Sequence, residues 1–214
     1  MLSLIDSEGS SALTRRNAVA LPMISLLVFS SLTSVAAALP QYNAKTTPIP
    51  ASGKNHTFTA GEAIIKCGKA EFKYTGAMGL FSTITVVPSY KECFIKEQEA
   101  TVAVEKAKFE FGQPKEVTSL EYSLPASIVG ETGAKLKVTA KVEGENCEVQ
   151  FPAQTIAGEN TKFVDNGGKT GGEVKAKLEK LEYKSNSKCG GLVPAEGKNG
   201  KYEGGAAETG LVIE

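Results

Sequence analysis

The sequence predicts an all-β protein, an antiparallel β-sandwich-like domain held by two disulfides and preceded by a signal segment and a linker. From residue 57 onward, short runs alternate apolar and polar side chains and are broken by Gly, Pro and Asn, as in half-buried strands joined by turns. The four cysteines are an even number behind an export-type N-terminus, which indicates disulfides. Between these features lies a stretch with three prolines and no apolar period.

Residues 1–38 are typical of an export signal. Arg15 and Arg16 precede an apolar run, roughly Ala18 to Leu32, that carries no charge. Small residues follow it and predict cleavage after about Ala38. An uncleaved membrane anchor is the alternative, but several serines and a proline dilute the run, whereas a span needs about 20 mainly apolar residues. Both interpretations place the rest of the chain outside the cytoplasm.

Residues 39–56 form the predicted linker, extended and partly disordered, and residues 57–214 form the predicted all-β domain. The clearest strand is Lys135–Val142, in which apolar residues at alternate positions face one side and Lys and Thr face the other. The predicted strands are Thr57–Ile65, Ala70–Tyr74, Phe81–Val87, Thr101–Phe111, Ser119–Ser123, Lys135–Val142, Glu148–Phe151, Val174–Tyr183 and Lys201–Glu214.

The segment 173–183 fits two kinds of secondary structure. Val174, Leu178 and Leu181 have helical spacing, and Lys and Glu favour helix. The same segment fits a strand with one bulge, which we favour because the neighbouring segments are β. Asn-Gly pairs predict turns at residues 165–168 and 198–201.

Cys67, Cys93, Cys147 and Cys189 predict two disulfides. Three pairings are possible, and we favour the local one, Cys67–Cys93 with Cys147–Cys189, because it gives each half of the domain its own bridge. A zinc site is disfavoured because no two cysteines are closer than 26 residues and His56 is the only histidine. A nucleophilic thiol would need a base, and His56 lies in or beside the predicted linker.

Composition and motifs point to no catalytic, cofactor-binding or metal-binding residue. The chain has 24 Lys plus Arg and 24 Asp plus Glu, so it lacks the basic surface that nucleic acid requires. Gly168-Lys169-Thr170 lacks the preceding glycine of a phosphate-binding loop. Asp165-Asn166-Gly167 is only a fragment of a calcium loop. Asn55-His56-Thr57 is a formal glycosylation sequon.

Three stretches carry a resemblance to a known group of proteins. They are IIKCGKAEFKYTG at 64–76, TVVPSYKECF at 85–94 and CEVQFPAQ at 147–154. Together they resemble small exported, disulfide-containing β-rich proteins of unknown function from high-GC Gram-positive (actinobacterial) soil bacteria, over about residues 57–205. The resemblance implies export and disulfide bridges, and it transfers no catalytic residue.

These observations predict a non-enzymatic extracellular or cell-envelope protein that acts by binding or as a structural β domain. Its partner would be an unknown cell-envelope or extracellular ligand, with no nucleic acid and no cofactor. Contact with a membrane would occur only through the N-terminal segment, if that segment is uncleaved. Two alternatives remain open, an extracellular hydrolase with an unrecognised carboxylate site and a membrane-anchored surface domain.

Overall fold

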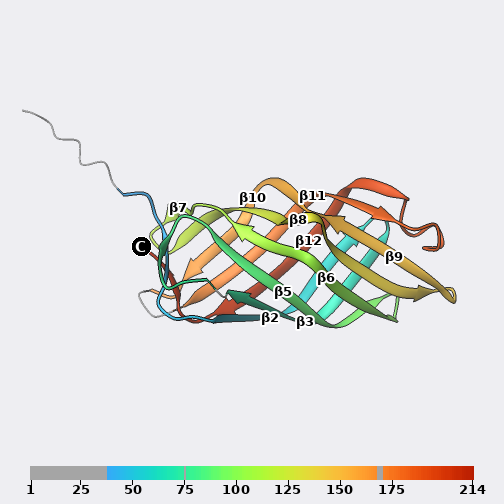
Figure 1. Cartoon of the computed structure of the whole chain (residues 1–214), viewed down its shortest axis with the longest axis horizontal. Coiled ribbons are helices and arrows are strands. Elements are labelled where there is room, and N and C mark those ends of the chain that lie inside the picture. The colour runs from blue at the N-terminus through green and yellow to red at the C-terminus, as the bar shows by residue number, and fades with distance from the viewer. Residues whose placement is uncertain (1–37, 75, 168–170) are drawn as a thin grey trace, which may run out of the picture. The chain divides into compact units, whose positions relative to one another are not determined.

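The computed structural model describes residues 38–74, 76–167 and 171–214, which belong to the unit Ala38–Glu214 (Figure 1). Except for Ala38, the predicted signal segment lies outside these residues. The described part of the chain contains strands and turns, and it holds no helix long and apolar enough to cross a membrane. The strands are β1 Tyr42–Ala44, β2 Ile49–Ala60, β3 Ala63–Tyr74, β4 Gly79–Phe81, β5 Ile84–Ile95, β6 Gln98–Phe111, β7 Lys115–Thr118, β8 Glu121–Val142, β9 Glu145–Pro152, β10 Gln154–Asp165, β11 Gly172–Ser185, β12 Glu196–Glu208 and β13 Leu211–Ile213.

Eight of these strands form a closed antiparallel barrel (Figure 1). The order around the wall is β10-β11-β12-β2-β3-β5-β6-β8, and pairing of β8 with β10 closes the ring. The all-β class is therefore confirmed, and the predicted sandwich is wrong. Alternation identifies which face of a strand is buried, but that face is the same in a sandwich and in a barrel. Closure depends instead on which distant strands pair.

On one side of the barrel, β10 and β11 pair along only part of their length. These strands pair over Lys162–Asp165 and Gly172–Lys175, while β8 pairs with β10 through its first half and with β9 through its second half. Beyond this pairing, the side chain of Gln154 in β10 bonds to the backbone of Glu182 in β11, in place of backbone–backbone hydrogen bonds. Its Oε1 accepts a 2.7 Å hydrogen bond from the Glu182 N–H, and its Nε2 donates to the Glu182 carbonyl at 3.1 Å.

A small sheet of β13, β1 and β4 lies at one end of the barrel, beside the C-terminus at the left of Figure 1. We call it the cap. Tyr42 is fully buried, and its hydroxyl donates to the Gly112 carbonyl at 2.8 Å. The prediction that residues 39–56 form a linker is wrong, because β1 and most of β2 lie there. In this segment Tyr42, Ala44 and Ile49 face the core. Three prolines interrupt the sequence there, so its apolar pattern does not stand out as a strand.

Several boundary predictions also fail. The predicted strands Phe81–Val87 and Lys201–Glu214 are each divided between two strands of the structure. The predicted strand Thr57–Ile65 is interrupted by a hairpin turn between β2 and β3, where Gly61 has a φ of 60°. The predicted turn at 198–201 lies inside β12. There Gly200 is needed for close approach rather than for a turn, because a Cβ at this position would lie 2.7 Å from the Leu181 carbonyl oxygen.

Other predictions agree with the structure. The segment 173–183 is strand, within β11, and a bulge shifts its register between Leu178 and Leu181. In β8, the side chains at alternate positions from Leu136 to Val142 are buried as expected. The turn predicted at 165–168 is only partly described. Gly167 lies just after β10 in a bend with a φ of 72°, and residue 168 lies outside the described part of the chain.

The structure contains both disulfides, in the favoured pairing. Cys67–Cys93 joins directly opposed residues of β3 and β5. Cys147–Cys189 ties β9 to the loop that follows β11. Two disulfides indicate an oxidising, non-cytoplasmic compartment.

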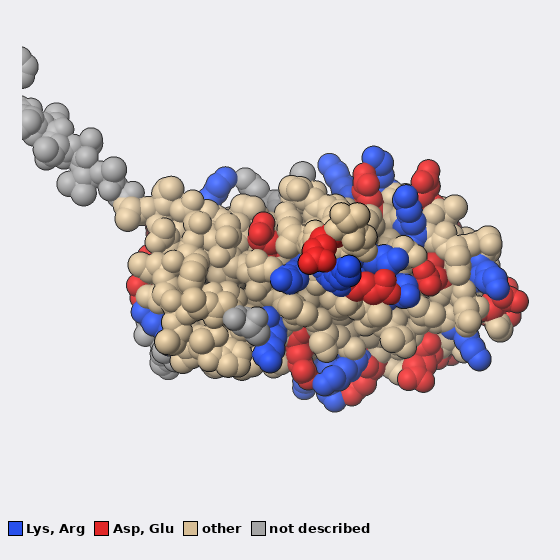
Figure 2. Space-filling view, in the orientation of Figure 1, with Lys and Arg blue, Asp and Glu red and all other residues tan. Residues whose placement is uncertain are grey.

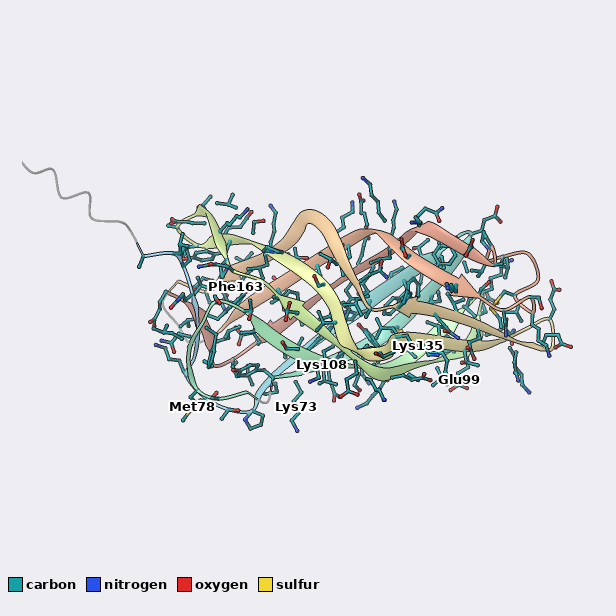
Figure 3. All side chains as sticks on the ribbon, turned by 45° about the horizontal axis from the view of Figure 1, so that its top comes forward. Lys73, Met78, Glu99, Lys108, Lys135 and Phe163 are labelled. Carbon is teal, nitrogen blue, oxygen red and sulfur yellow. A yellow bond between two sulfur atoms is a disulfide. The ribbon has the colours of Figure 1, made fainter. Side chains whose placement is uncertain are left out.

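Apolar side chains fill the barrel and charged ones cover its wall. Figure 3 labels Phe163 of β10, which is fully buried, and the exposed Lys73, Glu99 and Lys108. On the face in Figure 2, Lys and Arg side chains are interspersed with Asp and Glu. Exposed pairs such as Lys69–Glu92 are held at 2.6 Å, and pairs of this kind contribute little to stability. Packing of the apolar core, rather than these surface pairs, therefore holds the side chains in the barrel interior.

Candidate functional site

A small apolar cavity of about 50 Å³ lies inside the barrel. Side chains from opposite sides of the wall line it, with Phe72 on β3, Phe109 on β6, Leu178 on β11 and Tyr202 on β12. The lining continues to Leu211 of β13, so the cavity reaches the cap. Small-molecule binding sites are likewise apolar and concave with a few polar groups, although they are usually several times larger.

His56 lies in the cavity wall and is completely buried. Its Nδ1 is 2.8 Å from the Tyr202 hydroxyl, and its ring packs against Phe72 with 5.6 Å between centroids. Two glycines leave the space that the ring occupies. A Cβ at Gly204 would lie 2.1 Å from Nδ1, and one at Gly53 would lie 2.8 Å from Nε2. We call Gly53 and Gly204 the glycine cradle.

The aromatic polar groups around this cradle are uncharged near neutral pH. Burial lowers the pKa of His56, and the Gly53 carbonyl only partly opposes that effect. Burial also raises the pKa of Tyr202 and of its neighbour Tyr90. Although Nε2 of His56 lies near Gly53 and the Tyr90 hydroxyl lies near Tyr202, neither atom meets hydrogen-bond geometry with any described residue. The cradle therefore holds buried hydrogen-bonding capacity that is not fully used.

Glu208, at the end of β12, is the acidic residue of the cavity lining. Its side chain is 5% exposed, and its Oε2 accepts a 3.0 Å hydrogen bond from the Leu211 N–H. Its Oε1 has no partner among the described residues. Burial, with a smaller contribution from Asp165, raises the pKa of Glu208 from 4.5 to about 7, against the effect of the Leu211 and Gly172 N–H groups.

The raised pKa of Glu208 predicts that stability changes with pH. In the unfolded chain this carboxyl ionises above its ordinary pKa of 4.5, whereas in the folded protein it stays protonated until about pH 7. Its contribution is therefore complete below pH 4.5 and is lost as pH rises through 7. We expect the free energy of unfolding to fall by about 2–3 kcal/mol over this window.

Urea unfolding at pH 5, 6, 7 and 8 measures this effect. The matched control is Glu208→Gln, which keeps the hydrogen-bond acceptor but does not titrate. Wild type should lose stability relative to the variant as pH rises from 5 to 7, and the difference should then stay constant up to pH 8. A difference that is constant over the whole range would contradict the assignment.

The sequence did not identify this site. The prolines place His56 in or beside a predicted linker, yet it lies in β2 and is completely buried. The only available signal was the pair Gly204-Gly205 inside an alternating segment, because glycine in a strand often marks close approach. The four cysteines that had been singled out form bridges and do not belong to the cavity lining.

The remaining motifs add no further site. Asp165 closes β10, and Asn55 is an exposed residue of β2 with a φ of 59°. Gly168-Lys169-Thr170 lies outside the described residues. Across the described ranges, no three His, Cys, Asp or Glu residues gather in a way that could hold a metal ion.

The sequence and the fold were compared with known proteins. No protein-family model matches the chain, and neither the curated proteins nor the solved structures that were searched give a match.

Proposed function

We propose that this protein is an exported, non-enzymatic binding protein that takes up a small, mostly apolar molecule in its barrel cavity. The observation that carries the proposal is an apolar cavity lined from opposite walls by Phe72, Phe109, Leu178 and Tyr202. Burying apolar surface in such a space is favourable by roughly 25 cal/mol for each Å² removed from water. The two disulfides support an extracellular or cell-surface location.

The composition of the lining favours binding over the hydrolase alternative. Glycoside hydrolysis generally uses two carboxyl groups that flank the scissile bond. Glu208 is the one carboxyl among the described lining residues. His56 has neither an adjacent nucleophile nor an orienting carboxylate among its described contacts, which are aromatic rings and backbone.

The volume limits the size of the ligand. A cavity needs about 10–15 Å³ to hold one water, so a cavity of about 50 Å³ has room for roughly four waters. A compact molecule with about five non-hydrogen atoms replaces them. We therefore take 1-butanol as a first probe, with an expected dissociation constant on the order of 1 mM.

Titration of the ¹⁵N-labelled protein with 1-butanol tests the proposal. Saturable shifts are expected at the amides of Gly204 and Gly205, which line the cavity. The matched variant is Ala176→Leu, which fills the lining of β11 and should abolish these shifts while circular dichroism stays unchanged. Shifts that fail to saturate, or that persist in the variant, would contradict binding in the cavity.

The export part of the proposal has a separate test. N-terminal sequencing of the secreted protein should give a start near Leu39. A mature protein that retains residues 1–38 would support the anchored alternative.

A further inference from the structure

We infer that the cavity selects small organic cations, a primary or methylated amine, over neutral and anionic molecules of the same size. This inference rests on the proposed function, since it concerns the ligand of the same cavity. The first observation is the set of charged side chains that line the cavity. Lysine and arginine are absent from the described lining, and Glu208 is its single carboxyl.

The other ionisable groups near the cavity cannot supply a charge at neutral pH. His56 of β2 is neutral because burial lowers its pKa, and Tyr74 of β3 and Tyr202 of β12 are neutral because burial raises theirs. Asp165 of β10 adds a second negative group close enough to affect Glu208. The cavity can therefore become negative and has no described group that would make it positive near neutral pH.

The hydrogen bonds of the Glu208 carboxyl group leave one of its oxygens free to accept a hydrogen bond from a ligand. One carboxyl oxygen accepts from the Leu211 N–H, and the other is buried and meets hydrogen-bond geometry with no described residue, although the Gly172 N–H lies near the carboxyl. An unpaired buried carboxylate oxygen costs free energy, and a charge-assisted hydrogen bond removes that cost. An ammonium group supplies both a donor and the compensating charge. A carboxylate ligand supplies neither, and it would be repelled.

Aromatic rings form much of the remaining wall, which suits the same ligand class. Phe109 packs against Phe111, Phe72 and Tyr202 with centroid distances of 6.5, 6.2 and 5.5 Å, and all four rings line the cavity. Such rings give an alkyl chain apolar surface to pack against. An ammonium near Glu208 with its alkyl chain among these rings would satisfy both the charge and the apolar surface.

The test is a charge series of nearly constant size, with n-butylamine, 1-butanol and butyrate titrated into the full domain at pH 8. We expect n-butylamine to bind roughly tenfold more tightly than 1-butanol, and butyrate to bind least. Binding should lower the pKa of Glu208, which is measured by its ¹³C carboxyl shift. Below pH 7 the affinity for the amine should fall by up to about tenfold for each pH unit, because the carboxyl must lose a proton first.

Glu208→Gln supplies the matched variant. It should bind n-butylamine and 1-butanol with similar affinity, independent of pH between 6 and 8. Equal affinities in the wild type, or a preference for the amine that survives in the variant, would overturn the inference and leave the proposed function intact. Failure of every probe to bind would overturn both. If the variant does not fold, the wild-type series and the carboxyl titration still decide the question.

Discussion

Gly204→Ala is expected to lower the free energy of unfolding by about 3 kcal/mol. The new methyl group would lie 2.1 Å from Nδ1 of His56 and 2.9 Å from the Tyr202 hydroxyl. The imidazole cannot turn away freely, because it is fully buried and paired with that hydroxyl. Relief would require breaking the His56–Tyr202 hydrogen bond or moving β12 away from β2. Urea unfolding measures the loss.

Two controls make this result specific to the glycine cradle. Gly205→Ala adds the same methyl group next door, where the nearest atom is 3.3 Å away, and it should cost less than about 1 kcal/mol. The double variant His56→Ala, Gly204→Ala should lose less than the sum of the two single losses, because the clash disappears with the ring. Equal effects of Gly204→Ala and Gly205→Ala would contradict the role of the cradle.

Removal of the Cys147–Cys189 bridge, as the double variant Cys147→Ala, Cys189→Ala, is expected to cost about 4 kcal/mol. The bridge closes a span of 42 residues, and the loss of loop-closure entropy in the unfolded chain gives that magnitude. The bridge also ties β9 to a loop with few regular backbone pairs. Unfolding of oxidised wild type and of the variant under identical conditions measures the difference.

Removal of the Cys67–Cys93 bridge, and ligand binding in the cavity, serve as two controls for this prediction. Cys67→Ala, Cys93→Ala opens a shorter span of 26 residues, so its entropic cost should be slightly smaller, about 3.5 kcal/mol. Neither cysteine of the longer bridge lines the cavity, so 1-butanol should bind the Cys147→Ala, Cys189→Ala variant as it binds wild type. A loss below about 1 kcal/mol for that variant would contradict a stabilising role for the bridge.

Local sequence patterns predicted much of this fold because they depend on neighbouring residues. Alternation in Lys135–Val142 identified a buried face, and the spacing of Leu178 and Leu181 identified a bulged strand. The pattern failed where proline interrupted it, in the first half of β2. It could not distinguish a barrel from a sandwich, since closure requires the pairing of β8 with β10 and of β12 with β2.

The site was beyond local patterns for the same reason. His56 and Tyr202 are 146 residues apart in the sequence, and the space for the imidazole comes from a glycine on each of two strands. Considered by itself, a single histidine beside prolines resembles a linker residue. Likewise Glu208 looks in the sequence like one of many surface acids, yet in the fold it is buried and accepts a hydrogen bond from the Leu211 N–H.

The cap also determines the order in which the protein can be completed. Backbone hydrogen bonds join Gln41 to Glu214, and β1 pairs with β13 from Tyr42 opposite Ile213. A ribosome or an export channel delivers β1 before β13, so β1 must wait for β13 before the two can pair. The cavity next to the cap is therefore finished last. A ligand held there would therefore be enclosed only after β13 has paired with β1.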